Sequence, residues 1–191
     1  MKLSKIIVGF VPLVAYGLVS QWISPGWAAV IGLIVTVAVI GVTAAQGGVK
    51  ILPVVTGVIL VPIAVVAFAY PGADAFLSDY GRAIASLCLG VFILATLSIM
   101  PFTEQMARES VPSDLWHTAK FREVNQKLSA LWGAVVLGSG VANVLAGALT
   151  HADAAPVVAT LLRLGVPVLG IVYGLKITKQ ITEHAAAAPA Q

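Results

Sequence analysis

Six uninterrupted apolar runs of about 20 residues each most constrain what this chain can fold into. A helix of roughly 20 apolar residues crosses the roughly 30 Å hydrocarbon core of a bilayer. None of the runs alternates polar and apolar residues with a period of two, so the pattern is not that of an outer-membrane barrel. The runs cover residues 6–23, 27–45, 49–70, 83–100, 128–149 and 155–175.

These runs predict an all-α integral membrane protein, a bundle of six transmembrane helices. Only 10% of the 191 residues are charged and 59% are apolar, which excludes a water-soluble single domain. Turn residues at 24–26 and 46–48 make the first three helices antiparallel neighbours. We expect one transmembrane domain over residues 1–184, with a polar cytoplasmic elbow at 101–127 between helices four and five and a disordered tail at 185–191.

Basic residues predict the orientation of the bundle. Nine of the eleven fall on the side of the N-terminus when the runs are threaded through a membrane, so both termini are expected in the cytoplasm. The same rule accounts for the net charge of +3 without a nucleic-acid partner. The nine are Lys2, Lys5, Lys50, Arg108, Lys120, Arg122, Lys127, Lys176 and Lys179.

The elbow holds eight of the nineteen charged residues and is one candidate surface for a protein partner. Glu104 and Arg108 stand at i,i+4 spacing, which predicts a helical ion pair. After Pro112 the mixture of apolar and basic residues predicts a second helix, lying in the membrane interface. A solvated elbow that rests on lipid headgroups is the alternative. The candidate partner-binding residues are Arg108, Lys120, Arg122 and Trp116.

The apolar runs contain no Asp, Glu or His, so proton relays, metal sites and base-activated nucleophiles are not expected in the membrane. The lone Cys88 makes neither an intrachain disulfide nor a multi-cysteine metal site. We therefore expect no metal and no cofactor. An enzyme acting on a lipid-linked substrate would have only Glu104, Glu109 and His117 for acid–base chemistry, all at the inner surface.

Arg163 is the exception inside the runs. It stands eight residues into the last run, about 12 Å deep, and Asn143 reaches about 9 Å from the same side. Arg163 could bind an anion such as a lipid phosphate or an isoprenoid pyrophosphate, or it could merely fix the bundle through Asn143, helix-end carbonyls or water. An outer-half polar cavity would have as candidate ligand-binding residues Arg163, Asn143, Tyr16, Thr36 and Trp132. Arg82 would line its mouth or form a surface ion pair with Asp79.

Small residues suggest how the last two helices meet. Gly140 and Gly147 share a face with Asn143, and Gly170 and Gly174 share one with Arg163, so close packing of these two helices is expected. The same faces could join copies in a homo-oligomer. A rough match between the proline-bearing third and sixth runs also leaves open an inverted repeat, as in many transporters.

Several residues resemble the bacterial intracellular septation protein A family of small inner-membrane proteins. They are Phe10-Val11-Pro12-Leu13, Pro101, Gln105, Met106, Pro112, Trp116, and Trp132 with Gly140-Val141-Ala142-Asn143. The resemblance implies a role in septation and envelope integrity through division or elongation proteins, and it supplies no catalytic residues. The chain departs from the family in its longer elbow.

The leading hypothesis is therefore a non-enzymatic inner-membrane protein that supports the cell envelope or septation through protein or lipid contacts. The alternatives are a small carrier or binding protein for a lipid or anionic metabolite that uses Arg163, and an intramembrane enzyme.

Overall fold

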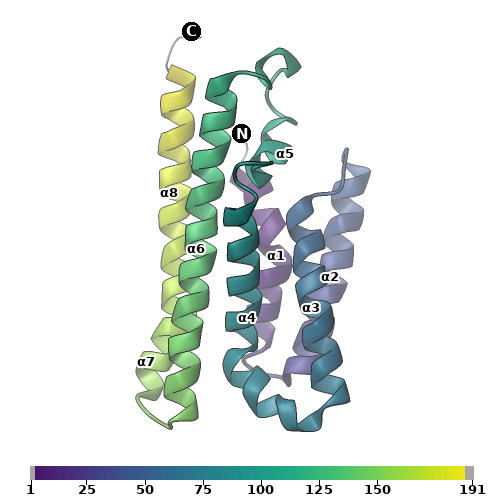
Figure 1. Ribbon diagram of the computed structural model, residues 1–191, viewed down its shortest axis with the longest axis vertical. Coiled ribbons are helices and arrows are strands. Elements are labelled where there is room, and N and C mark those ends of the chain that lie inside the picture. The colour runs from purple at the N-terminus through teal and green to yellow at the C-terminus, as the bar shows by residue number, and fades with distance from the viewer. Residues whose placement is uncertain (1–2, 188–191) are drawn as a thin grey trace.

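The computed structural model describes residues 3–187, apart from the side chains of 3–5, 71, 186 and 187, and every element within that range is helical (Figure 1). Five helices are long and apolar enough to cross a membrane, and α1 adds a shorter apolar helix. The chain is thus a helical membrane protein, as predicted; the count of six spans stays a prediction. The elements are α1 (Leu3–Val19), α2 (Pro25–Ala45), α3 (Ile51–Ala69), η1 (Pro71–Ala73), α4 (Asp74–Ala95), α5 (Phe102–Ala107), η2 (Ser113–Leu115), α6 (Ala119–His151), α7 (Pro156–Thr160), η3 (Leu161–Gly165) and α8 (Val166–Ala187).

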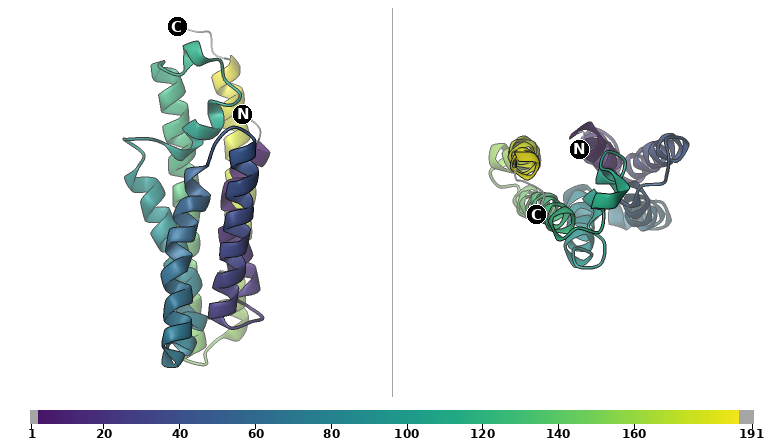
Figure 2. Two further views of the ribbon diagram at one scale, coloured as in Figure 1. Left: turned by 90° about the vertical axis from the view of Figure 1, so that its right-hand side faces the viewer. Right: turned by 90° about the horizontal axis from the view of Figure 1, so that it is seen from above.

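The long helices lie side by side as an elongated bundle. The start of α1 and the end of α8 lie at the same end as α5, and the α3–α4 connection and α7 lie at the other end (Figure 1). Seen along the bundle, α4 lies between α6 and the group formed by α1, α2 and α3 (Figure 2). The two ends are called here the α5 end and the α7 end.

Two helices begin earlier than the apolar runs predict. α4 begins at Asp74 and α6 at Ala119, each nine residues before the predicted span. The hydroxyl of Thr118 caps α6 by accepting a hydrogen bond from the amide of Phe121 at 3.2 Å. The prediction of a separate interfacial helix after Pro112 is therefore wrong: those residues form a short η2 turn and the first turns of α6. At 33 residues, α6 is about 50 Å long and exceeds the hydrocarbon core.

Glycines let α4 and α6 approach until their backbones touch. A Cβ atom at Gly140 would lie 2.9 Å from the backbone nitrogen of Leu87, and one at Gly147 would lie 2.6 Å from the carbonyl oxygen of Asp79. These two glycines were expected to face the last helix, and that prediction is wrong. Only Gly170 and Gly174, on α8, face α6 as expected, against Val135 and Trp132.

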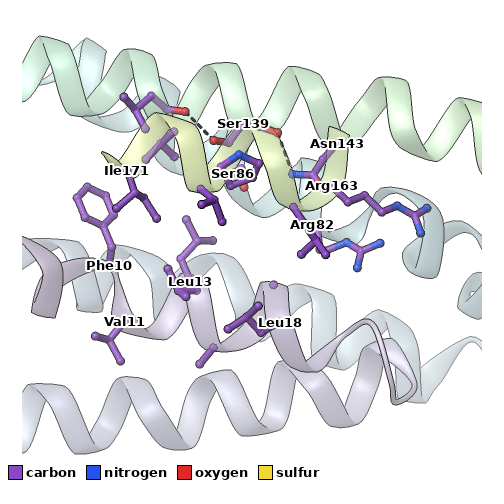
Figure 3. A pocket seen from close by; sticks show the side chains of 18 of the residues that line it. Phe10, Val11, Leu13, Leu18, Arg82, Ser86, Ser139, Asn143, Arg163 and Ile171 are labelled. Atoms are coloured by element: carbon purple, nitrogen blue, oxygen red, sulfur yellow. Dashed lines mark hydrogen bonds between the residues drawn. The ribbon is translucent and has the colours of Figure 1, made fainter. Parts of the chain in front are cut away.

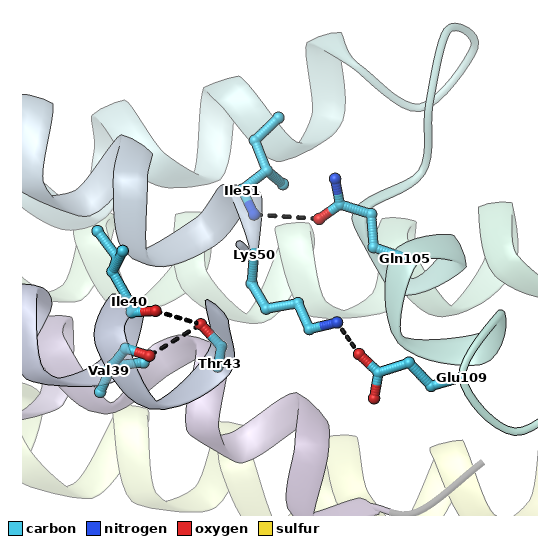
Figure 4. A network of polar contacts seen from close by, with 7 residues as sticks. All are labelled: Val39, Ile40, Thr43, Lys50, Ile51, Gln105 and Glu109. Carbon is cyan, nitrogen blue, oxygen red and sulfur yellow. Dashed lines mark hydrogen bonds and ion pairs between the residues drawn. The ribbon is translucent and has the colours of Figure 1, made fainter. Parts of the chain in front are cut away.

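Polar contacts tie the short α5 to its neighbours. Gln105 Oε1 accepts a hydrogen bond from the amide of Ile51, the first residue of α3, at 3.0 Å, and Lys50 forms an ion pair with Glu109 (Figure 4). On the other side, the hydroxyl of Thr103 donates to the carbonyl of Asn125 at 2.8 Å. The elbow is thus an ordered part of the bundle where it follows α4.

The third and the last apolar segments, which the sequence left open as an inverted repeat, differ in structure. α3 runs unbroken through Pro62, whereas residues 156–187 contain a π-helical turn, η3, between α7 and α8. The chain is helical to Ala187, so the first part of the predicted disordered tail belongs to α8, and residues 188–191 lie outside the described range.

Candidate functional site

A cavity of about 490 Å³ lies between α1, α4, α6, η3 and α8. Its walls are mostly apolar, with Phe10 and Leu13 from α1 and Ile171 from α8 (Figure 3). Ser86, Ser139 and Asn143 supply polar atoms, and the guanidinium groups of two arginines lie at one end. The cavity is therefore apolar over most of its length, with its two cationic groups at one end.

The cavity opens sideways between α1 and α8. Ile7, Val14 and Leu18 of α1 line it while keeping 44%, 41% and 45% of their surface exposed, and Val168 of α8 does so at 56%. In a helical membrane protein, exposed apolar side chains such as these face lipid chains. The opening therefore connects the cavity with the bilayer.

Arg82 is one of the two arginines, and it is buried. Only 7% of its surface is exposed, and its Nη1 atom has no hydrogen-bond partner among the described residues. It was predicted to stand at the surface or at the mouth, whereas it lies eight residues inside α4. A buried guanidinium nitrogen without an acceptor is unfavourable, since its hydration has been lost without replacement.

Arg163 is the second arginine and belongs to the π-helical turn η3. Its Nη2 donates to the hydroxyl of Thr150 at 2.8 Å and lies 3.8 Å from a carboxylate oxygen of Asp79. Its Nε is buried without a partner in the described part of the chain. π-Helical turns occur frequently at functional sites, because the extra residue re-aims the side chains around it.

The prediction that no carboxylate lies within the membrane-spanning helices is wrong, because α4 contains Asp79. It lies five residues into α4, where it contacts Arg163 and also approaches Nδ1 of His151 at 3.5 Å. Arg163 therefore has a carboxylate partner, and the predicted contact with Asn143 does not appear among the described hydrogen bonds. Asn143 instead donates from Nδ2 to the carbonyl of Ser139 at 2.8 Å.

Of the five predicted ligand-binding residues, Arg163, Asn143 and Trp132 line the cavity. Trp132 lies at its apolar end, where it stacks on Phe10 with ring centroids 5.4 Å apart and donates from Nε1 to Thr178 at 3.1 Å. Asn143 Oδ1 is buried and has no partner within residues 3–187.

Tyr16 and Thr36, the other two predicted ligand-binding residues, do not line the cavity. Tyr16 is buried against α2, α3 and α4. Thr36 donates to the carbonyl of Gly32 at 2.8 Å and packs against Gly57 of α3. The position of a residue along a helix can be counted from the sequence, whereas the direction of its side chain depends on how the helices pack.

The four candidate partner-binding residues do not form one surface. Arg108 pairs with Glu104 at 2.5 Å, as predicted, and lies over the ring of Trp116 at 5.2 Å. Arg122 donates to the carbonyl of Ser98 at 2.6 Å. Arg108, Trp116 and Arg122 line one pocket of about 450 Å³ at the α5 end. Lys120 lines a separate groove between α6 and α8.

The described residues contain no group of three His, Cys, Asp or Glu side chains that could hold a metal ion. No protein-family model matches the chain, and no curated protein or solved structure is significantly similar to it. The resemblance to intracellular septation protein A therefore stays a prediction. The cavity is the feature of the chain that bears on its function.

Proposed function

We propose that this chain is a non-enzymatic membrane protein that binds an anionic membrane lipid in the cavity between α1 and α8. The acyl chain would enter from the bilayer and lie along the apolar wall, and the headgroup phosphate would accept hydrogen bonds from the two arginines. The observation that carries the proposal is Arg82, a buried cation with a nitrogen that lacks a partner at the end of an apolar cavity. Guanidinium groups bind phosphate through two parallel hydrogen bonds.

Native mass spectrometry of the purified protein with added phosphatidylglycerol tests this proposal. Arg82→Gln and Arg163→Gln should each weaken binding by roughly ten- to a hundredfold, the cost of one hydrogen bond to a charged group. Arg122→Gln is the matched control, because it removes one positive charge at the α5 end and leaves the cavity intact. Equal affinity for the wild type and both cavity variants would overturn the proposal.

The same cavity could also take part in lipid transport, which requires movement of the bound lipid in addition to binding. A carrier would move the bound lipid between leaflets, so Arg163→Ala should abolish lipid flux in liposomes while the protein still folds. Unchanged flux would limit the chain to binding.

The proposed location is a bacterial inner membrane, as the resemblance to intracellular septation protein A implies. The basic residues at the α5 end support cytoplasmic termini. A role in envelope maintenance or septation through division proteins also remains a prediction. The elbow gives it limited support, because Arg108, Trp116 and Arg122 already make contacts within the chain.

A further inference from the structure

The charges at the arginine end of the cavity do not balance. Arg82 and Arg163 bring two positive charges, and the carboxylate of Asp79 brings one negative charge. Nδ1 of His151 lies 3.5 Å from the same carboxylate and is not part of this count. Among the described residues, Arg82 and Arg163 are the charged side chains that line the cavity, and Asp79 contacts Arg163 without lining it. The three side chains together carry one net positive charge.

We infer that Asp79 makes the site selective for lipids with a single negative charge, which means a phosphodiester headgroup in place of a phosphomonoester or a diphosphate. This inference rests on the proposed lipid binding. A buried, uncompensated charge is costly, and a monoanion brings the cluster to neutrality. A dianion would leave one excess negative charge beside the carboxylate of Asp79.

The geometry explains why Asp79 can have this role without blocking the site. Its carboxylate lies 3.8 Å from Arg163 Nη2, a long contact, and the Nε atom of Arg163 and the Nη1 atom of Arg82 stay without partners among the described residues. Asp79 therefore neutralises one charge and leaves two donor atoms without an acceptor in the described chain. Both atoms are closed off in this structure, so a rotation of each guanidinium group would bring them to phosphate oxygens. Only 14% of the Asp79 side chain is exposed, so solvent screens its charge weakly.

The test compares phosphatidylglycerol, a monoanion, with phosphatidic acid of the same acyl chains, whose phosphomonoester carries more negative charge. Phosphatidylcholine, a zwitterion, is the reference lipid. The wild type should prefer phosphatidylglycerol. Asp79→Asn raises the net charge of the cluster to two, so the ratio of the two affinities should shift towards phosphatidic acid by about tenfold or more. Asp79→Glu keeps the charge and should keep the wild-type preference.

A second variant changes the charge in the opposite direction and serves if Asp79→Asn does not fold. Ser86 lines the cavity one helical turn after Arg82, so Ser86→Asp brings the cluster to neutrality. Phosphatidic acid, the more negative lipid, should then lose more affinity than phosphatidylglycerol, so the ratio of the two affinities should shift further towards phosphatidylglycerol.

The outcomes separate this inference from the proposed function. A wild type that binds neither anionic lipid better than phosphatidylcholine overturns both. A wild type that binds phosphatidylglycerol through Arg82, with a lipid preference that neither Asp79→Asn nor Ser86→Asp changes, overturns the selectivity alone.

Discussion

At the scale of single residues, the main feature of the cavity is a pair of arginines that each have a nitrogen without a hydrogen-bond acceptor in the described chain. Nη1 of Arg82 and Nε of Arg163 are buried donors without acceptors among the described residues, whereas Trp132, at the other end of the cavity, has a hydrogen-bond partner. A site that is polar at one end and apolar along the rest has the chemistry of a lipid with one headgroup and a chain. Binding of an acyl chain in the apolar part can therefore be tested by substitution, as phosphate binding by the arginines can.

Gly17 offers a way to fill the apolar part. It lines the cavity, and a Cβ atom there would meet no heavy atom of the described chain within 4 Å. Gly17→Leu should therefore fold normally and lower the affinity for phosphatidylglycerol by about tenfold, since the leucine side chain takes the space of the acyl chain. Titration of the lipid by native mass spectrometry measures the change.

Gly41→Leu is the control for that substitution. Gly41 also has open space around it, but it belongs to α2 and does not line the cavity. Lipid binding that falls equally in both variants would contradict a chain-binding role for the cavity.

At the scale of helices, the site depends on the contact between α4 and α6. α4 carries Asp79, Arg82 and Ser86, and α6 carries Asn143 and Thr150 from the other side. The two helices touch through glycines, so the distance between these side chains is determined by backbone contact.

Gly140→Ala tests that contact. The added methyl group would lie 2.9 Å from the backbone nitrogen of Leu87, so the variant should lose about 1–3 kcal/mol of unfolding free energy. Gly138→Ala, two residues away on the same helix, adds its methyl group into open space and should be neutral or stabilising by about 1 kcal/mol. Unfolding in detergent measures both, and equal losses would argue against a close α4–α6 contact.

The elbow gives a second prediction at this scale. Gln105 accepts a hydrogen bond from the first amide of α3, so Gln105→Ala should lower the unfolding free energy by about 1 kcal/mol and expose α5 to proteolysis. The exposed Gln180 on α8 provides the control variant. If both variants show the same protease sensitivity, Gln105 does not hold α5 against α3.

At the scale of the whole molecule, the two ends differ in charge. The described basic residues outside the cavity gather at the α5 end. Arg163, at the arginine end of the cavity, belongs to η3, which directly follows α7 at the other end of the bundle (Figure 1). Tags inserted at residues 76 and 115 should therefore report opposite sides of the membrane, with residue 115 in the cytoplasm. Accessibility of single cysteines or reporter fusions at these positions measures this, and reports from the same side would contradict the topology.

Some features of this protein follow from local sequence patterns, and others depend on tertiary structure. Hydropathy predicted a helical membrane protein and singled out Arg163, because a charge inside an apolar run stands out. It placed Arg82 and Asp79 outside the fourth span, because the charged residues of 74–82 lower the hydropathy of a window that includes them, although α4 continues through them. A membrane helix can include such charges when they pair with another helix, and that pairing depends on tertiary structure.

The measurement that tests the central claim most directly is an experimental density map of the protein in nanodiscs that contain phosphatidylglycerol. Our account predicts phosphate density within hydrogen-bond distance of Arg82 Nη1 and Arg163 Nε, continuous with an acyl chain along Phe10 and Leu13. A cavity closed by the two guanidinium groups binding Asp79, Asn143 or backbone carbonyls, with no lipid between α1 and α8, would contradict it.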